Sequence, residues 1–253
     1  MFCVAGHSKW ANIKHRKGKE DARRGQLFTK LARQITLAAR EGGGDPESNF
    51  RLRLAMDKAR GSNMPNDNIE RAIKRGTGEL EGVNLEEVVY EGYGPGGMAI
   101  LLEALTDNRN RTASDVRHVF SKHGGNLGES GCVAWMFEKK GRLVIDKQAT
   151  PIDEETLMLE AIEKGAEDIE VDEEYVELIT APGDFLTIKE ALESSGYEFE
   201  DAEVTMIPTN TVEVPRDKAG QALRLLEALD ELDDIQEVYA NGDIDEEALS
   251  EGA

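Results

Sequence analysis

A run of basic residues near the start of the chain carries the clearest chemical signal in the sequence. Residues 9–19 read KWANIKHRKGK, which places five lysines or arginines, one histidine and one tryptophan within eleven positions. Lysine and arginine neutralise phosphates, and a tryptophan can stack on an unpaired base. The residues expected to bind nucleic acid here are Lys9, Trp10, Lys14, His15, Arg16, Lys17 and Lys19. Anionic lipid or an acidic protein would attract the same charges, but the segment lacks the regular apolar face of an interfacial helix.

Further basic residues are expected on helices. Between residues 20 and 41, apolar residues recur at the spacing of one helix face, at Leu27, Phe28, Leu31, Ile35 and Ala38. Beside that face, within about 100° of arc, lies a basic stripe formed by Arg23, Lys30, Arg33 and Arg40. Arg109 and Arg111 begin a later predicted helix, where a helix N-terminus and two guanidinium groups would favour a phosphate. The competing interpretation is that these two arginines pair with the chain's many carboxylates.

The sequence patterns that could indicate catalysis or metal binding lack the features that these functions require. Residues 92–97 match the G-x-G-x-x-G fingerprint of dinucleotide sites, which requires a helix directly after the glycines. The next residues, 98–102, read MAILL and predict a strand, so a hairpin turn is favoured. His118 and His123 lie about 140° apart on one helix, which does not suit a zinc pair. We therefore expect no enzyme activity, no metal site, no cofactor and no small-molecule substrate.

Charge is distributed unevenly along the 253 residues. The whole chain has a net charge of −21, which alone would argue against a nucleic-acid partner. Residues 1–75, however, hold 17 lysines and arginines against 8 acidic residues, a net charge of +9. Residues 76–253 hold 13 against 43, a net charge of −30. This asymmetry indicates a basic interaction module on an acidic body.

The composition also indicates in which cellular compartment the protein is found. No apolar run approaches the ~20 residues that a membrane-spanning helix requires, and the first residues do not resemble a secretory signal. The two cysteines, Cys3 and Cys132, are too few for a disulfide framework, which fits a reducing compartment. We expect a cytoplasmic protein that does not bind membranes.

Glycines and prolines divide the chain into elements. The basic part predicts three short helices, over 20–41, from Asp45-Pro46 and from Pro65, followed by a glycine-rich hinge over 76–82. Next come strands 86–91 and 98–105, helix 109–123 and strand 132–137. A β-α-β-β-α-β order, typical of ferredoxin-like folds, then covers strand 142–146, helix 153–164, strands 168–171 and 175–180, helix 183–194 and strand 198–207. Strand 211–214, helix 216–229, strand 235–239 and a frayed acidic tail after Ala240 complete the prediction.

These elements predict an α+β protein with three domains. The first, over residues 1–80, is a basic helical module with its N-terminal arm and hinge. The second is a discontinuous middle domain over 83–138 and 208–243, because the last three elements are too few to form a domain alone. The third, over 139–207, is a ferredoxin-like domain inserted into the second.

Several motifs together resemble those of the YebC/PmpR family. They are GHSKWANIKHRK at 6–17, RG at 24–25, LFTKL at 27–31, NMP at 63–65, YEGYGPGG at 90–97, TDNRNRT at 106–112 and KHGGNLG at 122–128. The resemblance implies a three-domain protein of the bacterial cytoplasm, described as a probable DNA-binding transcriptional regulator. Mitochondrial relatives act as translational activators, and bacterial members have been linked to relief of ribosome stalling. Phe50 departs from the family pattern, in which a proline is usual.

Two hypotheses about function remain open. The first is a DNA-binding transcriptional regulator, as the family description implies. The second is a translation factor that contacts ribosomal or transfer RNA, which the acidic body and the lack of an obvious base-reading helix favour. In both, the protein acts without catalysis, and we expect a monomer.

Overall fold

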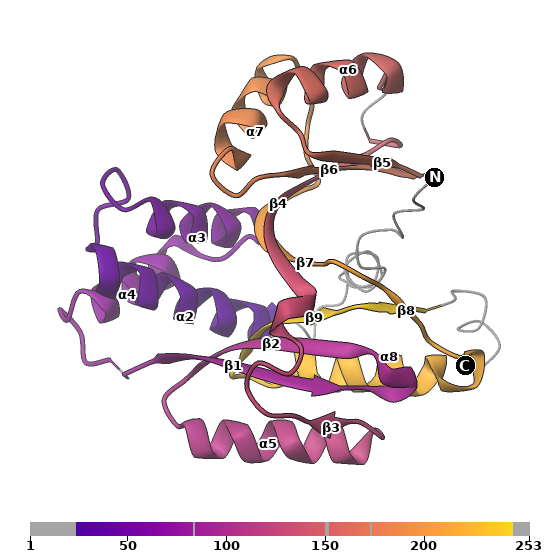
Figure 1. Ribbon diagram of the computed structural model, residues 1–253. Coiled ribbons are helices and arrows are strands. Elements are labelled where there is room, and N and C mark those ends of the chain that lie inside the picture. Colours follow the sequence, from indigo (N-terminus) through magenta and orange to yellow (C-terminus); the bar gives the residue numbers. More distant parts are fainter. Residues whose placement is uncertain (1–23, 83, 150–151, 173, 245–253) are drawn as a thin grey trace. The chain divides into compact units, whose positions relative to one another are not determined.

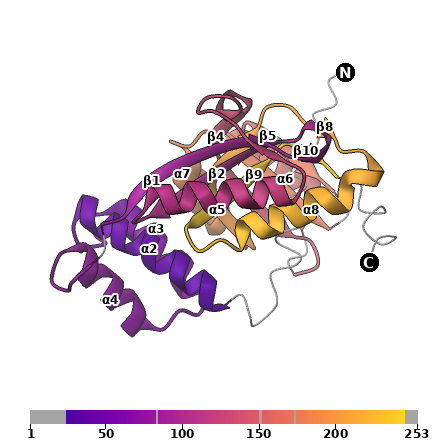
Figure 2. The same ribbon diagram turned by 90° about the horizontal axis from the view of Figure 1, so that it is seen from below.

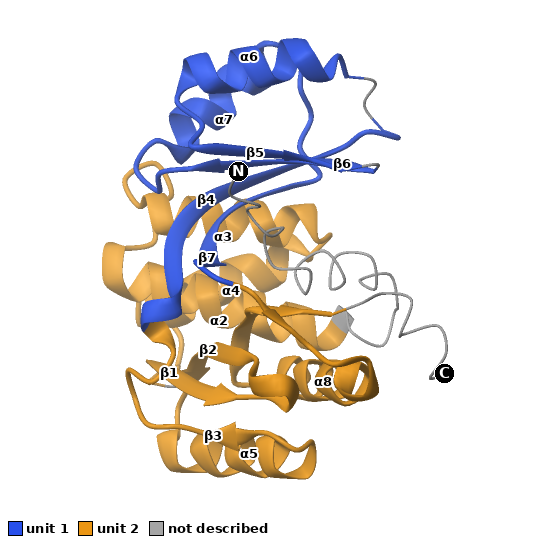
Figure 3. Ribbon diagram, turned by 45° about the vertical axis from the view of Figure 1, so that its right-hand side comes forward, with its two compact units in different colours: residues 1–7, 135–210 blue, residues 8–134, 211–253 orange. Residues whose placement is uncertain are grey.

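The structure, a computed structural model of the chain, describes residues 24–82, 84–149, 152–172 and 174–244. These residues separate into two compact units (Figure 3). Residues 135–210 form the first unit, and residues 24–134 together with 211–244 form the second. Within the described ranges, no helix has both the length and the apolar character that crossing a membrane requires.

Three helices form a helical module in the second unit: α2 (Arg24–Gly42), α3 (Phe50–Gly61) and α4 (Asn66–Gly76) (Figure 1). Their inward faces share one apolar cluster, which removes from water a face that no single helix could bury alone. The buried members of this cluster are Leu31, Ile35, Ala38, Ala39, Leu52, Met56, Ala59, Met64, Ile69 and Ala72. The predicted three-helix module is therefore confirmed.

The start of α3 differs from the prediction. The helix is capped by Asn49 and not by Asp45, so residues 45–48 form a turn. The buried Asn49 amide accepts a hydrogen bond from the backbone N–H of Leu52 at 3.1 Å. It also donates to the carbonyl oxygens of Ala38 at 2.8 Å and Gly43 at 2.7 Å. Asn49 both caps α3 and satisfies carbonyls at the end of α2, which the exposed Asp45 cannot do.

A four-stranded antiparallel sheet, the middle sheet, lies at the centre of the second unit in the order β3-β1-β2-β9. Its strands are β1 (Glu86–Tyr93), β2 (Ala99–Thr106), β3 (Asn126–Leu127) and β9 (Ile235–Ala240). Two helices lie side by side against it, α5 (Arg109–Lys122) and α8 (Arg216–Asp230) (Figure 2). Strand β9 pairs with β2, so the chain after residue 210 joins the sheet that begins at Glu86.

The glycine-rich segment 92–97 is a hairpin, as the sequence predicted. Strands β1 and β2 pair antiparallel, with Tyr93 opposite Ala99. Gly96 and Gly97 have φ angles of 78° and 82°, a conformation that glycine adopts without strain. The expected frayed tail after Ala240 is wrong for residues 241–244. There β10 (Gly242–Asp243) pairs in parallel with β8 (Val212–Glu213).

The predicted strand 132–137 is also wrong, because a buried carboxylate binds the backbone of this segment, which forms a loop and the short 3-10 helix η3 (Ala134–Met136). Glu91 accepts backbone N–H hydrogen bonds from Gly131 at 2.6 Å and from Val133 and Ala134 at 2.8 Å. Although burial alone would raise it, these hydrogen bonds hold the pKa of Glu91 below its usual value. N–H groups bound to Glu91 cannot join a strand ladder, and the chain becomes extended only at Phe137.

The first unit has the predicted β-α-β-β-α-β order. Its elements are β4 (Phe137–Asp146), α6 (Glu154–Lys164), β5 (Asp168–Val171), β6 (Tyr175–Thr180), α7 (Phe185–Ser194) and β7 (Asp201–Pro208). The sheet order is β5-β6-β4-β7 with antiparallel neighbours, and both helices cover the same face (Figure 1). This is a ferredoxin-like fold, so the predicted α+β class is confirmed.

Candidate nucleic-acid interface

The basic residues predicted to bind nucleic acid fall into two groups. Those of the first group lie outside the described residues: Lys9, Trp10, Lys14, His15, Arg16, Lys17, Lys19 and Arg23. Those of the second group are placed by the structure: Lys30, Arg33 and Arg40 on α2, and Arg109 and Arg111 on α5. Except for Arg109, every side chain of the second group is bound to groups of the second unit.

Two residues of the basic stripe, Lys30 and Arg33, lie against acidic residues at the end of α8 and in the turn before β9. Lys30 Nζ is 3.1 Å from a carboxylate oxygen of Asp230 and donates to the carbonyl oxygen of the same residue at 2.7 Å. Arg33 Nη1 is 2.9 Å from a carboxylate oxygen of Asp234 and also donates to the carbonyl oxygen of Asp233. Lys30 and Arg33 thus dock the helical module onto the segment that links α8 to β9.

Asp234 is the centre of this docking contact. Its carboxylate is only 9% exposed. Besides Arg33, it binds Arg111 Nη2 at 2.8 Å and the hydroxyl groups of Thr112 at 2.7 Å and Thr106 at 3.3 Å. Burial alone would raise the pKa of Asp234, but the hydrogen bonds from Arg111 and Thr112 and the charge of Arg33 hold it below its usual value. One carboxylate therefore joins α2, α5 and the start of β9.

Other basic residues of the helical module make similar contacts. Arg40 donates to Asn84 Oδ1 at 2.7 Å and to the carbonyl oxygen of Leu85 at 2.5 Å. On α3, Arg51 pairs with Glu87 of β1, and Lys58 Nζ is 3.3 Å from a carboxylate oxygen of Glu237. These contacts account for much of the module's positive charge without any ligand.

The side chains of the two arginines at the start of α5 have different surroundings. Arg111 pairs with Asp107 at 2.7 Å as well as with Asp234, which raises its pKa further above the usual value. Arg109 is exposed, and its side chain forms no ion pair within the described residues. The N-terminus of the helix is capped by Asn108, whose side chain accepts from the backbone N–H of Arg111 at 3.1 Å. The two predicted guanidinium groups therefore differ: carboxylates hold Arg111, whereas Arg109 is exposed.

A basic surface that was not predicted from the sequence lies on α4. Arg71, Lys74 and Arg75 are exposed, and none of them forms an ion pair with the part of the chain that the structure describes. Ile69 and Ala72 face the apolar cluster of the module, which turns these three basic side chains outward. The helical spacing of Ile69 and Ala72 in the sequence could have indicated this outward basic face.

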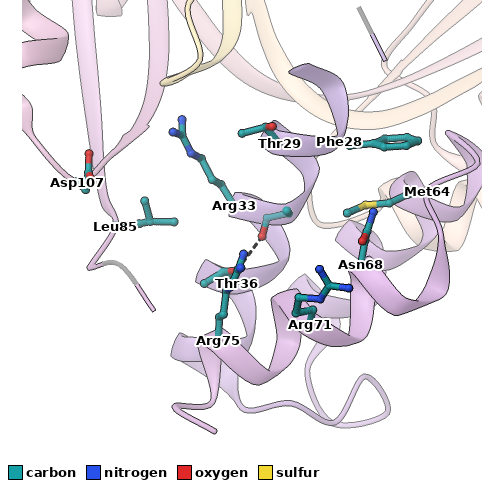
Figure 4. Close-up of a pocket in the computed structure, with 11 residues that line it drawn as sticks. Phe28, Thr29, Arg33, Thr36, Met64, Asn68, Arg71, Arg75, Leu85 and Asp107 are labelled. Carbon is teal, nitrogen blue, oxygen red and sulfur yellow. Dashed lines mark hydrogen bonds between the residues drawn. The ribbon is translucent and has the colours of Figure 1, made fainter. Parts of the chain in front are cut away.

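A pocket of about 350 Å³ lies between α2 and α4 (Figure 4). Its lining combines apolar, polar and basic side chains: Phe28, Thr29, Ala32, Arg33, Thr36, Met64, Asn68, Arg71, Arg75, Leu85 and Asp107. In Figure 4, Phe28 and Met64 lie at one end, Leu85 and Asp107 lie at the other, and the three arginines lie between them. The pocket thus offers an apolar surface beside concentrated positive charge.

Comparison with known families identifies the chain. Residues 8–79 match the TACO1/YebC protein N-terminal domain, and residues 85–242 match the TACO1/YebC second and third domain. The chain belongs to the TACO1/YebC family. The resemblance to YebC/PmpR proteins that the sequence motifs indicated is therefore confirmed.

Relatives of this TACO1/YebC protein align along nearly its whole length. A protein of Natranaerobius thermophilus is 60% identical over 250 residues, which cover 98% of this chain and 100% of the relative. A protein of Halothermothrix orenii is 58% identical and covers 98% of each chain. Both are named "Probable transcriptional regulatory protein". The crystal structure of the conserved hypothetical protein Aq1575 from Aquifex aeolicus is 52% identical, with a TM-score of 0.84, and the match covers 94% of this chain and 98% of that one.

Proposed function

We propose that this TACO1/YebC protein is a non-enzymatic, DNA-binding regulator of transcription that acts in the cytoplasm. The observation that carries the proposal is the exposed face of α4, where Arg71, Lys74 and Arg75 have no ion-pair partner within the described residues. Uncompensated arginine and lysine side chains on one helix suit a phosphate backbone. The names of the relatives support the regulatory role.

The basic residues have two roles in this proposal. Lys30, Arg33 and Arg111 position the helical module, since carboxylates at the end of α8 and in the turn before β9 already bind them. Phosphate contacts come from the face of α4, from Arg109 and from the basic segment 9–19. Positioning and binding residues together would present one basic surface to a nucleic-acid strand.

The test is the salt dependence of binding by the full chain. Each phosphate that is neutralised adds about −0.9 to the slope of log K against log salt on duplex DNA, and about −0.7 on a single strand. Replacing Lys14, Arg16 and Lys17 with alanine should flatten the slope by roughly two to three units if all three contact phosphate. The matched control is Lys139→Ala, Lys164→Ala and Lys189→Ala in the first unit, which removes the same charge and should leave the slope unchanged.

The nucleic acid is identified by binding duplex DNA and single-stranded RNA of equal length in parallel. Stronger binding of duplex DNA supports the transcriptional role. Trp10→Ala should then have little effect, whereas stacking on an unpaired RNA base would cost about 1–3 kcal/mol. If the protein prefers RNA and sediments with ribosomes in a cell lysate, the proposed role in transcription would be replaced by a role in translation. Binding of neither nucleic acid would refute the proposal.

A further inference from the structure

We propose that the pocket between α2 and α4 binds one unpaired nucleotide. Arg71 and Arg75 would hold its phosphate, and Phe28 would contact the face of its base. The volume of about 350 Å³ lies within the range of pockets that enclose small ligands. This inference rests on the proposed function, because it adds a nucleotide site to the same helical module. The base and phosphate ends each have separate support.

The phosphate end is an uncompensated pair of like charges. Arg71 and Arg75 lie one helical turn apart on α4, and both line the pocket (Figure 4). Like charges at this spacing repel each other, and neither residue forms an ion pair with any described residue. Asp107, the carboxylate in the lining, is itself bound to Arg111 at 2.7 Å. Two forked guanidinium groups are well suited to the oxygens of one phosphate.

The base end is apolar, with one polar group. Phe28 is partly exposed and lines the pocket with Ala32 and Met64, which gives a base a flat surface and an apolar edge. Asn68 also lines the pocket, and its side-chain amide has no hydrogen-bond partner within the described residues. An amide offers both a donor and an acceptor to the edge of a base. An inorganic anion would use the arginines and leave this surface uncovered.

The ligand must be unpaired. In a duplex the faces of the bases are stacked on each other, so a base can contact Phe28 only after it leaves the stack. Aromatic contacts of this kind are typical of proteins that bind single strands, and they combine with cationic groups that follow the backbone. The nucleotide can belong to a strand of RNA or DNA, or it can be a free nucleoside monophosphate, since all share the same phosphate and base.

The experiment compares Phe28→Leu with Phe50→Leu in the full chain. Phe50 on α3 is 42% exposed and lies outside the pocket, so it is a matched control. Binding is measured by fluorescence anisotropy with a labelled single-stranded RNA, the same single strand as DNA, and the corresponding duplex. Phe28→Leu should weaken single-strand binding about tenfold, leave the salt slope unchanged and leave duplex binding unchanged. Arg71→Ala with Arg75→Ala should flatten the single-strand slope by about 0.7, as for one shared phosphate.

Two further arms keep the test decisive. Asn68→Ala alters no packed apolar group and should also weaken single-strand binding, so the outcome does not depend on the folding of the Phe28 variant. Unlabelled nucleoside 5′-monophosphates should compete with the strand far better than inorganic phosphate does. The nucleotide site would be refuted if Phe28→Leu and Phe50→Leu weakened single-strand binding equally and Asn68→Ala did not weaken it. Salt-dependent binding of nucleic acid would in that case still support the proposed function. Absence of binding by the unaltered chain would instead refute the proposed function.

Discussion

Helices α2 and α4 both carry basic side chains along one face, yet these side chains have opposite surroundings. On α2, Lys30 and Arg33 contact Asp230 and Asp234, and their side chains are only 12% and 23% exposed. On α4, Arg71 and Arg75 are exposed and contact no carboxylate in the described ranges. The same residue types therefore serve docking on one helix and are available to a ligand on the other. A basic helical stripe indicates an electrostatic partner, and the partner can lie in the same chain.

The first unit and the N-terminal part of the chain that contains the helical module also differ in charge. Residues 135–210 hold 6 lysines and arginines against 21 acidic residues, a net charge of −15, whereas residues 1–75 carry +9. A ferredoxin-like unit of this charge repels phosphates, so the proposed nucleic-acid binding relies on the helical module. The acidic residues 230–234 of the second unit, by contrast, are used to hold that module in place.

The largest expected effect comes from removing the centre of the docking contact. Asp234→Ala leaves Arg33, Arg111 and Thr112 without their shared acceptor and should lower the free energy of unfolding by about 3 kcal/mol. Urea denaturation followed by circular dichroism measures this loss. Asp233→Ala is the control, because only the backbone carbonyl of this exposed residue contacts Arg33. Equal stability of the two variants would show that the contact does not hold α2 in place.

The pH dependence of stability tests the same contact of Asp234. The pKa of Asp234 is below its usual value in the folded chain, so its stabilising contribution is present above the unfolded-state pKa of about 3.9. That contribution is lost as the pH falls through the lower folded-state pKa. The stability difference between the unaltered chain and Asp234→Asn should be constant from neutral pH to about pH 5 and should close below about pH 4. Urea midpoints at a series of pH values test this, and a difference that grows in acid would contradict it.

A smaller effect is expected from removing the acidic unit. Deleting residues 135–210 and joining the ends with a short glycine-serine linker should leave a folded remainder, because β9 pairs with β2 inside the second unit. Nucleic-acid affinity should rise at low salt and change little near 0.15 M, where the screening length is only about 8 Å. Circular dichroism and anisotropy titrations check both statements. An unfolded remainder, or lower affinity at low salt, would show that the acidic unit supports binding.

Local patterns predicted much of the fold. The apolar spacing of α2 and the β-α-β-β-α-β order of the first unit were both predicted, because each depends on periodicity within a short window. The start of α3 was misplaced, because Asp45 and Asn49 are both capping residues and only tertiary contacts of Asn49 decide between them. The segment after β3 reads as a strand in the sequence but is not one, because its backbone is bound by Glu91, about 40 residues earlier.

The candidate site was predicted only in part. Composition located positive charge in the helical module but could not distinguish paired from unpaired residues. The carboxylates that bind Lys30 and Arg33 lie about 200 positions later in the chain, where no local pattern connects them to α2. The positions of Arg71 and Arg75 on the outward face of α4 could be predicted from helical spacing. The pocket beside them could be found only in the three-dimensional structure.

The comparison between α2 and α4 is tested most directly by two double variants measured side by side. Lys30→Ala with Arg33→Ala, and Arg71→Ala with Arg75→Ala, each remove two positive charges. For each we would measure unfolding in urea and the slope of log K against log salt on the same nucleic acid. The α2 pair should lower the free energy of unfolding by about 2 kcal/mol and leave the slope unchanged. The α4 pair should change stability by less than about 0.5 kcal/mol and flatten the slope by about 0.7 to 1.8, for one phosphate or two. A flatter slope for the α2 pair, with an unchanged slope for the α4 pair, would contradict this assignment.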